Sequence, residues 1–305
     1  MFLQQLSGSR LPQKSYPNYS VNLRADIRRA WSIDVPKLAI RHDNLLYQIL
    51  SMSALHLLRS ESDNPELIVA RQTYHGLALR EHRQAVAKLN VHNADAVSCA
   101  SSLIFMDAFA SLHDRPMEPY SPPMEWLQLA RGAGSVFAVG ISALEGSKVF
   151  ENAVINSIGK SHQYFENADL IFIEPNRKGL LGLLAQDIPG EPWDEETQQT
   201  YEKTLGYIGW VQLAIKDGEH ILGTCRRMMS FAVLAPKKFI EFVQEMRPRA
   251  LVILAHFLAL GSQMGDIWWI GENVQREIEG IHRALPVEWR PLMRQPLMRV
   301  GSSAV

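Results

Sequence analysis

Cysteine is scarce in this chain, and its scarcity excludes two classes of protein. Only Cys99 and Cys225 occur among the 305 residues. Two cysteines are too few for a disulfide framework or for a cysteine-rich structural zinc site. They are typical of a reducing compartment, so we expect an intracellular protein, in the nucleus or the cytoplasm.

An excess of charge is also lacking. Lysine and arginine number 31 and aspartate and glutamate 32, which gives a formal charge of −1. No general basic field is therefore available to hold DNA or an acidic membrane, and we expect no direct nucleic-acid contact by this chain. The N-terminal sequence MFLQQLSGSRLPQK has no sustained apolar run of the secretory type. No uninterrupted apolar run reaches the roughly 18 residues that span a bilayer, so we expect no membrane span.

Helical periodicity dominates what is present, and no strand-like alternation recurs. The segment DNLLYQILSMSALHLL is apolar nearly all round, which is typical of a helix buried on several sides; Asp43 or Asn44 could cap it. The Pro-rich stretch HDRPMEPYSPPMEW predicts a loop. The sequence predicts an all-α fold with helices over 43–58, 65–89, 94–112, 124–139, 146–159, 194–216, two helices broken near 247–248, and 264–285.

Motifs that carry chemistry are few. LARGAGSVF lacks the third glycine of a dinucleotide loop and follows a helical pattern, and G-x-S-x-G, H-E-x-x-H and C-x-x-C do not occur. His75 and His82 share a helical stripe, but a separation of roughly 10 Å prevents both from binding one metal ion. We expect neither a metal nor a cofactor.

Four residues have both a functional and a structural interpretation. His56 lies on the apolar face of its helix, as a pocket residue or general base, or as a hydrogen-bonded core histidine. Asp107 lies in the apolar run SLIFMDAFASL, and a buried carboxylate needs a partner or a proton, so it is a catalytic acid or a structural hydrogen-bonding group. Trp268 and Trp269 supply flat apolar surface for a ligand wall or for core packing.

The order of several motifs resembles a known family. Trp31, the P-x-L-A stretch at 36–39 and the S-A-L-H-L motif at 53–57 are followed by YHGLALREHRQAVAKLN and, near the C-terminus, by RALVILAHFLAL and DIWWIG. Over about residues 30–290 this order resembles the C-terminal regulatory domain of fungal binuclear zinc cluster transcription factors, in the branch of the sterol-uptake-control regulators. The resemblance implies a single multi-helix domain with an apolar internal cavity that binds a hydrophobic small molecule.

The chain departs from that family in two ways. It has no six-cysteine DNA-binding module, and Gln295 stands where the family commonly has a tryptophan before proline. We expect an N-terminal extension over 1–30, a regulatory and ligand-binding domain over 31–290, and a tail over 291–305. The chain is then either an excised or truncated regulator or a free-standing descendant.

Three functions fit these features. The first is a regulatory module that binds a hydrophobic small molecule and controls gene expression, possible pathways being sterol or fungal secondary metabolism. Its pocket residues would be Met52, His56, Phe105, Asp107, Phe109, His256, Trp268 and Trp269.

The second function is a cofactor-independent cyclase or isomerase that acts on an apolar polyketide or terpenoid, with Asp107, His113 and His256 as acids, bases or donors. Such catalysis depends on how the pocket orients the substrate, so it needs no local sequence motif. The third is an interaction protein that forms a homodimer or binds a full-length zinc cluster regulator. The first function implies no catalytic residue.

Overall fold

The structure is a computed structural model that describes residues 28–145, 154, 170–185, 191–265 and 267–301. All regular secondary structure within these ranges is helical, which confirms the predicted all-α class. The chain divides into two compact units. Unit 1 comprises Met1–Ala108 and Leu129–Glu166, and unit 2 comprises Phe109–Gln128 and Asn167–Val305.

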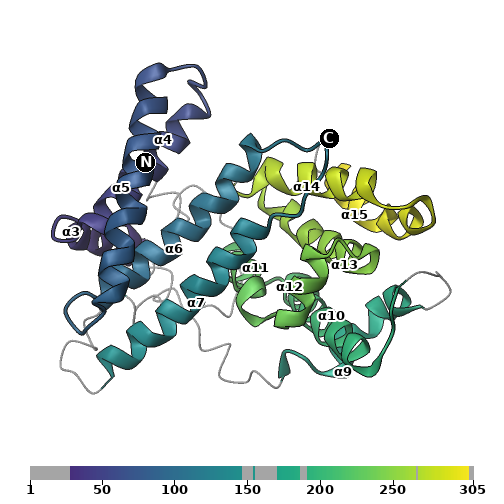
Figure 1. The fold of residues 1–305 in the computed structure, drawn as a ribbon. Coiled ribbons are helices and arrows are strands. Elements are labelled where there is room, and N and C mark those ends of the chain that lie inside the picture. Colours follow the sequence, from purple (N-terminus) through teal and green to yellow (C-terminus); the bar gives the residue numbers. More distant parts are fainter. Residues whose placement is uncertain (1–27, 146–153, 155–169, 186–190, 266, 302–305) are drawn as a thin grey trace. The chain divides into compact units, whose positions relative to one another are not determined.

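Unit 1 is built around a helical hairpin. Helices α4 (Asp43–Leu58) and α5 (Pro65–Ala87) pack along each other (Figure 1), preceded by η1 (Ala30–Asp34) and α3 (Val35–Ala39). Asn64 caps α5, because its Oδ1 accepts from the backbone N–H groups of Glu66 and Leu67 at 3.0 and 3.2 Å. Pro65 occupies the first helical turn, where its missing N–H costs nothing. The predicted starts of both helices are confirmed.

The predicted cap of α4 is wrong. His42 holds the N-cap position and makes no side-chain capping bond. Asn44 is instead buried, and its Nδ2 lies 3.4 Å from Nδ1 of His82 on α5. The side chain that sequence reasoning assigned to the helix terminus therefore joins the two helices of the hairpin.

Helices α6 (Ala94–Ala110) and α7 (Met124–Leu144) complete the purple-to-teal part of the chain in Figure 1. The C-terminal part of α7 packs with the start of α6 around Ala94 and Leu144. By length and composition the helical segments Ala94–Asp114 and Met124–Leu144 could cross a membrane, a criterion that the core helix of a soluble protein also meets. The absence of a membrane span stays a prediction.

Helix α13 (Pro248–Leu258) forms the centre of unit 2. Every residue from Arg249 to Leu258 is buried. The helices and turns of unit 2 are η2 (Ser111–Asp114), α9 (Glu174–Arg177), η6 (Lys178–Leu184), α10 (Glu195–Lys216), α11 (Ile221–Leu234), α12 (Lys237–Gln244), α13, η7 (Ala259–Met264), α14 (Gly271–Ala284), η8 (Val287–Met293) and α15 (Arg294–Gly301).

A buried arginine anchors α13. Arg249 is 2% exposed, and its Nε donates to Oε2 of Glu191 at 2.8 Å while its Nη1 donates to the carbonyl oxygen of Leu183. Its guanidinium lies 4.9 Å from the ring centroids of both Trp193 and Trp289. The buried charge is thus paired and stacked as well as hydrogen-bonded.

The boundaries in unit 2 are partly as predicted. Asp194 caps α10, accepting from the N–H of Thr197 at 2.7 Å, and the break before Pro248 is present. The predicted start of the last helix near residue 264 is wrong, because α14 begins at Gly271. A Cβ on Gly271 would lie 2.9 Å from the carbonyl oxygen of Gly265, so the backbone folds back on itself there and Trp268 and Trp269 lie in a turn.

Two further predicted segments can be compared with the structure. Helix α7 continues to Leu144, five residues past the predicted end. Within the expected tail over 291–305, residues 294–301 form α15. The helix predicted over 146–159 and most of the N-terminal extension lie outside the described residues.

Candidate functional site

The buried carboxylate of Asp107 is fully engaged in unit 1. Its Oδ2 accepts from Gln48 Nε2 at 2.9 Å, from Ser51 Oγ at 3.3 Å and from Arg71 Nη1 at 2.9 Å, and its Oδ1 accepts from Arg71 Nη2. Helices α4, α5 and α6 each contribute to this cluster. The partner that a buried charge requires is therefore present, on a neighbouring helix.

The same contacts set the protonation state of Asp107. Burial alone would raise the pKa of this carboxyl group, but hydrogen bonding with His75 and the positive charge of Arg71 outweigh burial and hold the pKa below its usual value of 3.8. A carboxyl group that stays ionised has no proton to give as a general acid. The arrangement favours a structural role for Asp107 over the catalytic one.

The other predicted pocket residues of unit 1 lie on the same helices. Met52 is completely buried on α4, whereas His56 on α4 and Phe105 on α6 are half-buried. Burial, and then the charge of Arg59, lower the pKa of His56. These positions are compatible with core packing, and their role in a pocket stays a prediction.

Unit 2 gathers three aromatic rings around the end of α6. The Phe109 ring meets the Trp126 ring edge-on at 4.8 Å between centroids, and it meets the Trp269 ring edge-on at 6.1 Å. All three side chains are buried, and Trp268 beside them is half-buried. We call Phe109, Trp126 and Trp269 the aromatic cluster. Phe109 and Trp269 are among the predicted pocket residues, whereas Trp126, three residues after Pro123, was not predicted.

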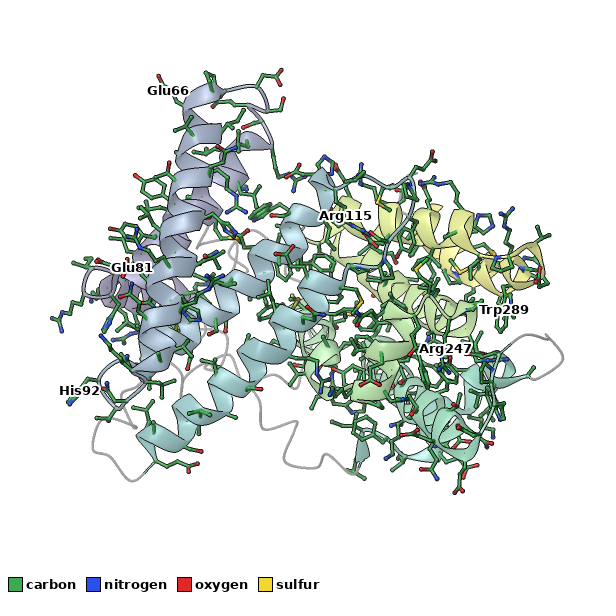
Figure 2. The ribbon with its side chains drawn as sticks, in the orientation of Figure 1. Glu66, Glu81, His92, Arg115, Arg247 and Trp289 are labelled. Atoms are coloured by element: carbon green, nitrogen blue, oxygen red, sulfur yellow. The ribbon has the colours of Figure 1, made fainter. Side chains whose placement is uncertain are left out.

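Helix α14 positions this cluster through two polar side chains one turn apart. Asn273 Nδ2 donates to the carbonyl oxygens of Phe109 at 2.8 Å and Trp269 at 3.3 Å. Glu277 accepts from Arg115 Nε at 2.9 Å and from the Tyr120 hydroxyl at 3.1 Å. The Pro-rich loop joins Phe109 to Trp126, so these contacts with α14 help to position both rings. Arg115, which makes one of the contacts, is labelled in Figure 2.

Glu277 carries a raised pKa. Burial raises it, and the hydrogen bonds and charge of Arg115 oppose the shift without cancelling it. Close packing adds to the anchor, since a Cβ on Gly280 would lie 2.5 Å from Met117 and 2.6 Å from Tyr120. The loop therefore lies directly against the backbone of α14.

The Trp126 indole N–H is the unusual polar group of the cluster. Trp126 is 1% exposed, and its Nε1 has no hydrogen-bond partner among the described residues. An unsatisfied buried donor costs about 1–3 kcal/mol in a folded protein. The aromatic cluster therefore combines buried apolar surface with one hydrogen-bond donor that no described residue uses.

The two histidines predicted as alternative catalytic groups in unit 2 have separate surroundings. His256 on α13 is buried, its Nε2 lies 3.0 Å from the carbonyl oxygen of Leu292, and burial lowers its pKa. His113 is exposed in η2 and lies 3.8 Å from Glu272. They share no partner in these contacts. In the described ranges, no three His, Cys, Asp or Glu side chains are grouped to hold a metal ion.

The chain is similar in sequence to known proteins. A protein-family model described as the fungal specific transcription factor domain matches residues 15–137. The Zn(2)-C6 fungal-type transcription factor afumD of Aspergillus fumigatus is 31% identical over 232 residues, which cover 75% of this chain and 60% of the relative.

Two further relatives match a larger share of this chain. A Zn(2)-C6 fungal-type transcription factor of Gibberella zeae is 25% identical over 82% of this chain and 52% of its own length. Sterol uptake control protein 2 of Candida albicans is 31% identical over 84% of this chain and 36% of its own length. The chain thus spans 36% to 60% of these three relatives. It belongs to the fungal specific transcription factor domain family and is a regulatory domain of the transcription-factor type.

Proposed function

We propose that this regulatory domain binds an apolar small molecule at the aromatic cluster and thereby controls gene expression in the nucleus. The observation that carries the proposal is the buried Trp126 N–H, which has no hydrogen-bond partner among the described residues, in a ring that packs against Phe109, which in turn packs against Trp269. A ligand oxygen that accepts this hydrogen bond would remove the cost of the unsatisfied donor. The name of the Candida albicans relative, sterol uptake control protein 2, favours a sterol, whose single hydroxyl group can be that acceptor.

Ligand binding would act on gene expression by changing the relative populations of two conformations of the domain. A ligand that contacts the aromatic cluster more strongly in one conformation favours that conformation, to the extent of its difference in affinity. Asn273 and Glu277 tie the cluster to α14, so a change at the rings reaches the Pro-rich loop and this helix. The full-length protein would convert this shift into altered promoter activity.

The binding experiment compares a fluorescent sterol that has a free 3-hydroxyl group with its 3-deoxy analogue. We expect the chain to prefer the hydroxylated sterol about fivefold, the equivalent of about 1 kcal/mol for one hydrogen bond. The Trp126→Phe variant keeps an aromatic ring and loses only the donor, so it should lose this preference. The control is Trp31→Phe in unit 1, which should retain the preference. Equal affinities in the wild-type chain, or a preference that survives Trp126→Phe, would refute the proposal.

A further inference from the structure

The closed end of the α4–α5 hairpin presents apolar side chains to solvent. Leu57, Ile68 and Val69 are 46%, 38% and 61% exposed. Leu57 is the penultimate residue of α4, and Ile68 and Val69 lie in the second turn of α5, so all three lie within roughly 8 Å of the turn along the helix axes. We call residues 57–69 the hairpin tip.

Acidic side chains accompany these apolar residues. Glu61, Asp63 and Glu66 are all exposed, against one exposed arginine, Arg59. The tip thus carries a formal charge of −2, from three carboxylates and one guanidinium, while the whole chain carries −1. Figure 2 labels Glu66 at this end of the hairpin. The tip thus combines exposed apolar side chains with a net negative charge.

Local hydrogen bonds support the backbone of the tip. Asn64 caps α5 through its Oδ1 and donates from Nδ2 to Oε2 of Glu61 at 2.7 Å. The Ser60 hydroxyl donates to the carbonyl oxygen of Leu57 at 3.0 Å. A surface already ordered in the free protein loses less conformational entropy when a partner binds. These bonds therefore favour recognition of the tip as a folded surface.

Charge selects the kind of partner. Three carboxylates repel the phosphates of nucleic acids and the anionic headgroups of a membrane. A two-fold contact between copies of this chain would place the same acidic patch opposite itself, which is unfavourable. A protein surface with an apolar groove bordered by lysine or arginine is complementary in both respects.

We propose that the hairpin tip is the surface through which this domain contacts a transcriptional coactivator that has a basic-bordered apolar groove. The proposal rests on the family and on the exposure and charge of the tip. It does not depend on ligand binding at the aromatic cluster, which lies in unit 2 while the tip lies in unit 1.

The test tethers the full chain to a heterologous DNA-binding module in yeast and measures a reporter gene. Two variants alter the tip, Leu57→Ser/Ile68→Ser/Val69→Ser and Glu61→Lys/Asp63→Lys/Glu66→Lys. Matched controls on an exposed site elsewhere are Val287→Ser, where the side chain is 72% exposed, and Glu288→Lys. We expect each tip variant to reduce activation about tenfold or more, as loss of central apolar or complementary charged contacts does at interfaces, and the controls to retain it.

Three results would overturn the proposal. One is a tethered wild-type chain that does not activate, and another is equal activation by the tip variants and the wild type. The third is a wild-type dimer, measured by sedimentation, that the tip variants convert to monomers, because the occupant would then be a second copy. Thermal unfolding and sterol binding of the purified variants should match the wild type, so failure here is distinguishable from failure of the ligand site.

Discussion

Removing either partner of the Arg71–Asp107 ion pair should destabilise unit 1 far more than removing both. The Asp107 side chain is 1% exposed and that of Arg71 is 14% exposed. Asp107→Asn keeps the shape but leaves a guanidinium without its counter-charge, and loss of one partner of a buried pair costs about 3–5 kcal/mol. The double variant Arg71→Met/Asp107→Leu removes both charges and should cost much less than the sum of the single changes, because well-packed apolar replacements are often close to neutral.

The stability of the single variant Arg71→Met should also depend on pH differently from that of the wild type. In the wild type the pKa of Asp107 is lowered, so the stability that the carboxylate contributes is present above its usual pKa of 3.8 and is lost as the pH falls through the lower folded value. In Arg71→Met the charge and hydrogen bonds of Arg71 are gone while the hydrogen bond with His75 remains, so we expect the pKa of Asp107 to rise above its wild-type value. The ionised carboxylate then contributes less stability than it does in the wild type. The stability difference from wild type should therefore shrink as the pH falls through these two pKa values.

The assay is equilibrium unfolding by urea, followed by circular dichroism, for the four members of this double-mutant cycle at several pH values. Single variants that each cost less than about 1 kcal/mol would show that the pair is not a buried interaction. Additive costs in the double variant, or a stability difference for Arg71→Met that grows on acidification, would refute the argument from desolvation.

Three further changes test other parts of the structure by thermal or urea unfolding. Gly209→Ala should destabilise unit 2 by more than about 3 kcal/mol, because the new Cβ would lie 1.7 Å from the carbonyl oxygen of Asn176; near-normal stability would contradict this packing of α9 on α10. Gly76→Ala should stabilise α5 by about 0.5–1 kcal/mol, since Gly76 is a mid-helix glycine with open space around it, and a loss of stability would show that its backbone is not helical. Burial lowers the pKa of His82 to about 4, so stability should fall by up to about 3 kcal/mol as the pH drops from 6.5 to 4, and His82→Gln should show a smaller decrease over this range.

Local signals predicted most of the helices. Pro65 and Asp194 mark helix starts through interactions within a few residues, and the structure uses both as expected. The start of the last helix was placed too early because the apolar pattern of DIWWIG continues the helical period. The close approach of Gly265 and Gly271 overrides that pattern, and a contact of this kind depends on the folded backbone.

The candidate sites were less predictable, because their contacts join distant parts of the chain. Asp107 needed a partner, but nothing near it in the sequence identifies Arg71, 36 residues away. Phe109 and Trp269 were found as aromatic residues in apolar segments. Trp126 lies in the first turn of α7, inside the helix predicted over 124–139, but it follows a run of prolines and was not among the predicted pocket residues. A tryptophan at the start of an apolar helix was the signal that could have identified it.

Arg249 limits how unit 2 can change during evolution. Its guanidinium uses its edge for Glu191 and a backbone carbonyl group, and it lies near the rings of Trp193 and Trp289. A lysine would keep the charge but lacks the planar fork and the stacking surface, so this exchange would not be conservative. A related protein could therefore replace Arg249 only if its partners, which come from three segments of the chain, were substituted as well. We expect sequence divergence in the family to keep Arg249 and these partners together.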